Sequence, residues 1–165
     1  MRCHDDSKIF KKAGSLLARR DHSRWELRTK LIKAAPASQV DRLLDRLEQL
    51  NLLNDHNYAY NFALSRMHNS GWGPARVRSY LLARGVGKEI VDSVLEQACK
   101  EVDQQSMIIK YAQMGFVRMK SRIGLPEVRK MISHLRRRGF EEEMIHSALR
   151  QILSARLLNN LETGE

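Results

Sequence analysis

Two groups of side chains have the types and the spacing of a helix face that binds polyanions. In the first group, Arg76, Tyr80 and Arg84 recur every fourth residue, which places all three on one side of a helix. The planar guanidinium of arginine pairs with phosphate, and an interleaved aromatic ring can stack on a base or on a partner's ring. The alternative for any single arginine is a helix face that is only solvated.

The same spacing recurs near the end of the chain, at Lys130, His134 and Arg138. A weaker version occurs in the first third of the chain, at Glu26, Lys30 and Ala34. Because the pattern occurs three times, it favours a binding role over a solvated face.

Charge is distributed unevenly along the chain, whose 165 residues include 29 Lys and Arg against 19 Asp and Glu, for a net charge of +10. Residues 19–33 hold six basic and two acidic side chains, residues 71–85 hold three arginines and no acid, and residues 118–138 hold eight basic and one acidic. The stretches that come after each of these are slightly acidic instead. Equivalent helices of a repeat array stack along one side, so we expect a continuous positive stripe, strongest in the last third.

The candidate binding residues are the basic and aromatic side chains of these three stretches. They are Arg24, Arg28, Lys30, Arg76, Arg78, Tyr80, Arg84, Lys120, Arg122, Arg129, Lys130, His134, Arg136, Arg137 and Arg138.

No catalytic constellation is visible. A phosphate-binding loop needs a glycine five residues before its Gly-Lys pair and Ser or Thr after it, but Gly87-Lys88 has Leu82 and Glu89 at those positions. The six histidines never pair with each other or with a cysteine at metal-ligand spacing. We therefore expect no enzyme, no catalytic residue, no cofactor and no metal.

Composition limits the setting of the protein. The longest apolar run is four residues, at 80–83, too short for a membrane span or for the core of a signal peptide. Cys3 and Cys99 are too few for a disulfide framework. We expect a cytoplasmic protein that does not associate with a membrane.

Apolar residues recur at intervals of three and four throughout, which predicts an all-α fold. Three segments share an apolar residue, another four later and a small residue four after that: Leu27/Leu31/Ala35, Val77/Leu81/Gly85 and Met131/Leu135/Gly139. With one helix before and one after each segment, this predicts about nine helices as an elongated tandem array of three three-helix repeats, at 8–54, 55–102 and 103–158. The first helices of the repeats are expected at about 8–20, 55–68 and 103–120.

Several residues mark where these helices start and stop. Gly85 and Gly139 suit the left-handed position after a helix, and Ala35-Pro36 is expected to end the equivalent helix of the first repeat. Ser23 with Glu26 predicts a capping box, and Ser38 with Asp41 a weaker one. Pro74 and Pro126 suit first helical turns. Residues 1–7 and those after about 158 are expected to be frayed.

Three runs carry a resemblance to the RecX family. Ser23-x-x-Glu26-Leu27-Arg28-x-Lys30-Leu31 is similar to the run that opens RecX-family proteins, and Leu52-Leu53-Asn54-Asp55-x-x-Tyr58-Ala59 resembles the junction that comes after it. Gly71-x-Gly73-Pro74-x-Arg76-Val77-x-x-x-Leu81-x-x-x-Gly85-Val86 resembles the family's most specific motif. Asn54 replaces the usual acid, and the last third matches only by pattern.

The resemblance implies a regulator of the RecA recombinase in DNA repair and the SOS response. Such a protein binds along the groove of the RecA filament on DNA, limits its growth, and dampens ATP hydrolysis, strand exchange and co-protease activity in homologous recombination. The implied partners are the RecA filament and single-stranded or duplex DNA, met directly or through the filament, and the protein is expected to be a monomer. The alternative is a DNA-binding helical module that acts without RecA.

Overall fold

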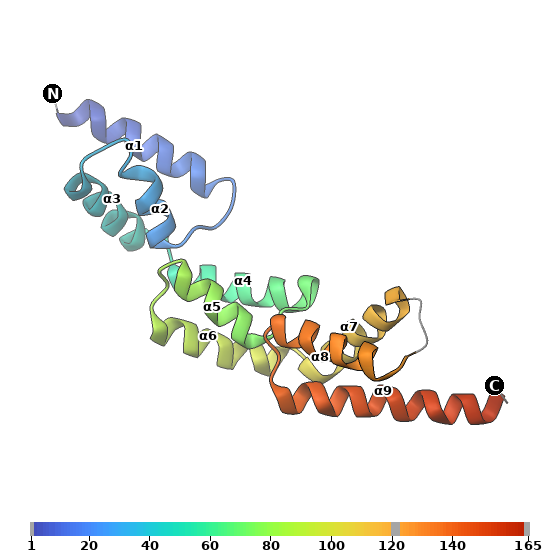
Figure 1. Ribbon diagram of the computed structural model, residues 1–165. Coiled ribbons are helices and arrows are strands. Elements are labelled where there is room, and N and C mark those ends of the chain that lie inside the picture. The colour runs from blue at the N-terminus through green and yellow to red at the C-terminus, as the bar shows by residue number, and fades with distance from the viewer. Residues whose placement is uncertain (1, 120–122, 164–165) are drawn as a thin grey trace. The chain divides into compact units, whose positions relative to one another are not determined.

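The computed structural model describes residues 2–119 and 123–163, and over these residues the secondary structure is helical without any strand (Figure 1). The all-α prediction is therefore confirmed. The nine helices of this part of the chain are α1 (Arg2–Leu17), α2 (Arg24–Leu31), α3 (Ala37–Gln49), α4 (Asp55–Ser70), α5 (Pro74–Ala83), α6 (Lys88–Glu101), α7 (Gln104–Met119), α8 (Leu125–Arg137) and α9 (Glu142–Thr163). None of the helices, as far as they are described, is long and apolar enough to cross a membrane.

The helices belong to two compact units. One unit holds the chain up to Phe62 together with Tyr80–Leu95, and the other holds Ala63–Ser79 together with the chain from Glu96 onward. The division passes through α4, α5 and α6, so it does not coincide with the expected repeat boundaries. The division into repeats at 8–54, 55–102 and 103–158 stays a prediction.

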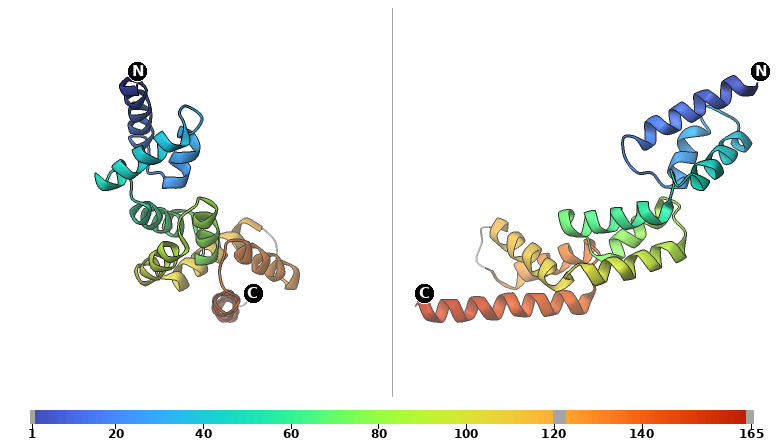
Figure 2. Two further views of the ribbon diagram at one scale, coloured as in Figure 1. Left: turned by 90° about the vertical axis from the view of Figure 1, so that its left-hand side faces the viewer. Right: turned by 180° about the vertical axis from the view of Figure 1, so that it is seen from behind.

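Helices α1, α2 and α3 pack against one another within the first unit (Figure 2). Their apolar stripes meet in one buried cluster, because residues three and four apart share a helix face. The cluster consists of Ile9, Ala13, Leu27, Leu31, Val40, Leu43, Leu44, Leu47 and Leu53. This core holds α2, the first of the basic helices, with its polar side outward.

Helices α7, α8 and α9 pack against one another in the second unit. Met107, Ile108 and Phe116 of α7 are buried, as are Met131 and Leu135 of α8. The predicted apolar pair Met131/Leu135 is thus a core pair. It fixes which side of α8 faces solvent.

The ends of the central helices agree with the predicted signals. Helix α5 begins at Pro74, and α8 begins at Leu125 with a proline in its first turn. Gly85 and Gly139 have φ values of +70° and +87°, in the left-handed region that favours glycine. Asn51, with φ +53°, closes α3 in the same way, and this was not predicted.

Several end predictions were wrong. Helix α1 begins at Arg2 and α9 extends to Thr163, although both ends of the chain were expected to be frayed. Extending a formed helix adds a hydrogen bond for each residue at little cost, and neither extension contains glycine or proline. Helix α2 ends at Leu31, ahead of Ala35-Pro36, and α3 is preceded by Pro36 with no side-chain cap, so the weak capping box at Ser38 does not form.

Candidate functional site

The outer side of α8 carries three exposed cations. Arg129, Lys130 and Arg137 are exposed, and none of them has an ion pair or hydrogen bond to another side chain of the described residues. Lys130 and Arg137 are seven residues apart and therefore lie on the same side of the helix. These three charges are available to an external anion.

The other charged residues of α8 interact within the protein. Arg136 pairs with Glu142 at the start of α9, at 2.6 Å, and the guanidinium lowers the pKa of that carboxyl group. His134 accepts a hydrogen bond from Arg138 Nε at 3.0 Å. Partial burial, together with the charges of Arg138 and Arg137, lowers the pKa of His134. At neutral pH this histidine is an acceptor rather than a cation.

A first junction joins the end of α8 to the end of α4 and the start of α5, and Arg138 is its central residue. Its guanidinium donates to the carbonyl oxygens of Ser70 and of Gly71, the latter at 3.1 Å, and lies 4.8 Å from the ring centre of Tyr111. Its own carbonyl oxygen accepts from the Gly73 amide at 2.7 Å, and the Gly139 carbonyl accepts from the Ala75 amide at 3.2 Å. The unpaired amides at the start of α5 thus meet the unpaired carbonyls at the end of α8.

Trp72 lies between two arginines just before α5. The Arg66 guanidinium is 5.4 Å and the Arg76 guanidinium 4.2 Å from the centre of its ring. Trp72 is half-buried, and its ring also contacts these cations. Arg76 keeps an exposed position on α5.

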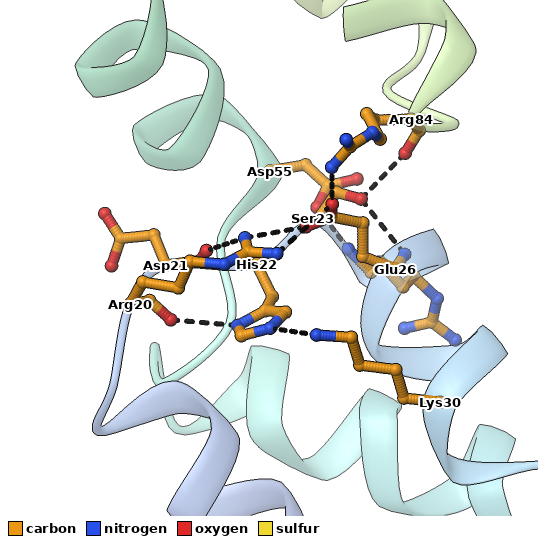
Figure 3. Close-up of polar contacts among 9 residues, drawn as sticks. Arg20, Asp21, His22, Ser23, Glu26, Lys30, Asp55 and Arg84 are labelled. Carbon is orange, nitrogen blue, oxygen red and sulfur yellow. Dashed lines mark hydrogen bonds and ion pairs between the residues drawn. The ribbon is translucent and has the colours of Figure 1, made fainter. Parts of the chain in front are cut away.

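A second junction joins the start of α2 to the end of α5 within the first unit (Figure 3). The Ser23 hydroxyl donates to the Arg84 carbonyl at 2.7 Å, and the Ser23 Oγ atom accepts from the Glu26 amide at 3.1 Å. The Glu26 carboxylate, only 6% exposed, pairs with the Arg84 guanidinium and with Arg20, the latter at 3.0 Å. Ser23 therefore caps α2 as predicted, but the Glu26 carboxylate binds two arginines rather than completing the capping box.

His22 and Lys30 extend this junction on the side of α2 (Figure 3). The His22 side chain lies 2.9 Å from the Arg20 carbonyl through Nδ1 and 2.8 Å from Lys30 Nζ through Nε2. A carbonyl only accepts and an ammonium only donates, so the proton of a neutral imidazole lies on Nδ1. The pKa of His22 is lowered, mainly by burial and also by the nearby charges of Arg20 and Lys30.

The arginines of α2 are neutralised by α3. Arg24 pairs with Asp45 at 2.6 Å and with Glu48 at 2.5 Å, and Arg28 pairs with Asp41 at 2.7 Å. The stripe predicted along this helix is consequently balanced by acids on its neighbour.

Four predicted binding residues have not yet been placed: Tyr80, Arg78, Lys120 and Arg122. Tyr80 stacks on Phe62, with ring centres 4.3 Å apart, and the Arg84 guanidinium lies 4.4 Å from its ring centre. Arg78 is partly buried. Lys120 and Arg122 lie outside the described residues.

The structure thus separates the predicted binding residues into two groups. Arg76, Arg129, Lys130 and Arg137 present charge to solvent, whereas Arg24, Arg28, Arg84, Arg136 and Arg138 hold parts of the chain together. Sequence reasoning missed the roles of Glu26, Arg20 and Tyr111 at the junctions. For Glu26, the only signal in the sequence was its position in the predicted capping box. That position suggested a bond to the start of its own helix rather than ion pairs with Arg20 and Arg84.

Comparison with known proteins covers most of the chain. Residues 10–47 match a family model described as RecX, first three-helix domain, and residues 54–95 match RecX, second three-helix domain. The regulatory protein RecX of Chlorobium phaeobacteroides is 32% identical, covering 90% of this chain and 95% of that protein. The regulatory protein RecX of Pseudomonas entomophila is 36% identical, covering 83% of this chain and 86% of that protein.

A crystal structure of RecX from Lactobacillus salivarius has the same fold, with a TM-score of 0.77 over 90% of this chain and 96% of that one, at 22% identity. The resemblance seen in the three sequence motifs is confirmed. The prediction of a regulatory protein rather than an enzyme agrees with these relatives, which are named regulatory proteins. Since two consecutive domain models and near-complete curated relatives agree, the chain belongs to the RecX family.

Proposed function

We propose that this chain binds the RecA filament on DNA through the exposed cations of α8 and α5, and that it limits RecA activity. Family membership supports a regulatory role, because the relatives are named regulatory protein RecX. The observation that carries the binding surface is the set Arg129, Lys130 and Arg137, exposed and without a side-chain partner among the described residues. We call these three residues the α8 cation surface.

Charge pairing elsewhere supports this choice of surface. On α2, each of Arg24 and Arg28 has an acidic partner on α3, so the helix offers little net attraction to phosphate. The α8 cation surface and Arg76 all belong to the second unit. Cations without internal partners gain most when they approach a polyanion, because no existing ion pair has to be broken.

The central test measures RecA ATPase on single-stranded DNA with increasing amounts of this protein. We expect the wild-type chain to lower the ATPase rate, and the triple variant Arg129→Glu/Lys130→Glu/Arg137→Glu to need at least about tenfold more protein for the same effect. A matched control, Lys11→Glu/Lys88→Glu/Lys110→Glu, reverses the same number of charges elsewhere. It should inhibit like the wild type, and equal inhibition by both triple variants would refute the proposed surface.

The same proteins separate this function from direct DNA binding without RecA. Binding to a labelled single-stranded oligonucleotide is measured with and without RecA, at about 50 and 200 mM salt. A binder driven mainly by phosphate contacts loses orders of magnitude in affinity over that range. Binding that needs RecA and persists at the higher salt supports filament recognition, whereas strong RecA-independent binding that salt abolishes favours the alternative.

We further propose the division into three repeats and a monomeric state. The repeat division is supported by the two junctions, because the same arrangement occurs in both. In each, the residue before a left-handed glycine, Gly85 or Gly139, accepts a hydrogen bond through its carbonyl oxygen from the start of an earlier helix. Ser23 donates to the Arg84 carbonyl and Gly73 to the Arg138 carbonyl. Sedimentation equilibrium across concentrations tests the monomeric state.

A further inference from the structure

A groove runs along the contact between α1 and α3, and none of its described lining residues belongs to either junction or to the α8 cation surface. Its main part has a volume of about 480 Å³, with Ile9, Phe10 and Leu43 among its lining residues. A second hollow of about 250 Å³ continues it toward Pro36, sharing Ile9 and Gln39 with the first. All the lining residues belong to the first unit.

The floor of the groove is apolar and partly open to solvent. Ile9 and Leu43 are buried and form its base, and Phe10 is 45% exposed. A phenylalanine ring left this open on a helix is a site where an apolar side chain of another molecule gains contact area.

The rim of the groove is basic because the charges of α3 are segregated by face. Asp41, Asp45 and Glu48 turn toward α2 and pair with its arginines. Arg42 and Arg46, one helical turn apart, line the groove and have no acidic partner among the described residues.

Lys8 and Lys12 of α1 line the second hollow. No Asp or Glu is among the described residues that line either part of the groove. The main part of the groove therefore has an apolar floor with Arg42 and Arg46 on its α3 side, and the second hollow adds Lys8 and Lys12 of α1. This arrangement is complementary to an acidic segment that carries apolar side chains on one face.

We propose that this groove docks an acidic amphipathic helix of a partner protein, with apolar side chains against Phe10 and Leu43 and carboxylates against Arg42 and Arg46. Such a helix presents anchors three and four residues apart, and a groove between two helices is the kind of site it fits. The apolar floor favours a protein over a nucleic acid, whose backbone would contact only the rim. The proposal does not rest on the proposed function, since the α8 cation surface lies in the other unit.

The test uses the full-length chain and defined probes. One pool contains helical peptides of about four turns with Leu, Ile, Phe or Met at anchor positions and Glu on both flanks. A second pool has Lys in place of Glu, and a thymidine oligonucleotide serves as the nucleic-acid probe. Amide chemical shifts of the isotope-labelled protein are followed during titration, and affinities of peptides retained by the immobilised protein are measured by fluorescence anisotropy.

We expect the acidic pool to shift the amides of residues 8–12 and 39–46, and the basic pool to leave them unchanged. Arg42→Glu/Arg46→Glu should weaken the best acidic peptide by about tenfold or more, and Phe10→Ser by about fivefold. The control Lys110→Glu/Arg150→Glu removes equal charge outside the groove and should change affinity by less than about twofold. Melting curves check that each variant is folded, and Arg42→Gln/Arg46→Gln replaces the reversal if that variant unfolds.

Several results would overturn the proposal. They are an absence of groove shifts with the acidic pool, equal shifts with the basic pool, and shifts of the same amides by the oligonucleotide. Concentration-dependent self-association that shifts these amides without any peptide would instead assign the groove to a second copy of this chain.

Discussion

Replacing Gly85 with alanine should destabilise the first unit through two separable effects. Gly85 has a φ of +70°, a conformation that a residue with a Cβ atom adopts only at a cost. A Cβ atom at this position would also lie 2.4 Å from Trp25 Cβ and 2.5 Å from Trp25 Cγ, which is closer than such atoms approach. Because rotating the Trp25 side chain leaves its Cβ in place, the backbone has to move, either at the end of α5 or in α2 at Trp25.

The magnitude comes from adding these two effects. The left-handed backbone costs about 1–2 kcal/mol for a residue other than glycine. Relieving the overlap with Trp25 costs about 1–3 kcal/mol, as for other small-to-large changes in packed sites. Trp25 is 48% exposed, so its ring can rotate away although its Cβ cannot, and we expect a total of about 3 kcal/mol. For a chain of this size that lowers Tm by about 6–12 °C.

Thermal and urea unfolding, monitored by circular dichroism, would measure this cost in a double-mutant cycle. On a Trp25→Gly background the Trp25 atoms that overlap, Cβ included, are all absent, and Gly85→Ala should cost only about 1–2 kcal/mol. Gly87→Ala is the matched control, since a Cβ atom added there would have no other atom within 4 Å and its φ is not in the left-handed region. Equal costs of Gly85→Ala with and without Trp25 would refute the packing argument, and equal costs at positions 85 and 87 would refute both parts.

Three further predictions concern the junctions. Gly139→Ala should cost more than the change at position 85, because its Cβ would meet the N, Cβ and Cα atoms of Arg76 at 2.3, 2.7 and 3.0 Å, and none of these moves when a side chain rotates; a smaller loss of Tm would contradict this. Glu26→Gln should lower the free energy of unfolding by about 2 kcal/mol in urea titrations, since the partly buried Arg84 loses its counter-ion. An unchanged urea midpoint would show that the Glu26–Arg84 pair does not stabilise the fold. Burial lowers the pKa of His22, so its contribution to stability is complete above about pH 6.5 and is lost as pH falls through the lower folded-state value. His22→Gln should flatten that part of the stability–pH curve, and a curve of unchanged slope would argue against the buried neutral imidazole.

Local patterns predicted the helices well because they depend on neighbours along the chain. The spacing of Leu27/Leu31 and Met131/Leu135 identified buried faces, and Gly85 and Gly139 identified helix ends. Helix periodicity and the left-handed glycine position are properties of a single segment, so the sequence contains all the information they need.

The functional residues were harder to predict because their partners lie far away in sequence. Arg84 and Arg138 share the spacing of a solvated helix face, yet each reaches a different element, Glu26 in one case and the Ser70 and Gly71 carbonyls in the other. Helical spacing specifies a direction around one axis, but not which residue of another helix occupies that direction. Of the residues on these two spaced faces, Arg76 and Lys130 are the ones that present charge to solvent, and Lys130 has no acidic partner among the described residues.

The carbonyl bonds at the ends of α5 and α8 also have a consequence for the order of synthesis. The donor to Arg84 is Ser23, and the donor to Arg138 is Gly73, so each helix end is completed by a residue that the ribosome has already made. A nascent chain can therefore close each junction as soon as the later helix emerges, before the rest of the chain has been synthesised. The same directionality makes truncation asymmetric. Removing residues up to 23 deprives the Arg84 carbonyl of its donor, whereas removing α9 removes neither donor nor acceptor of these two bonds.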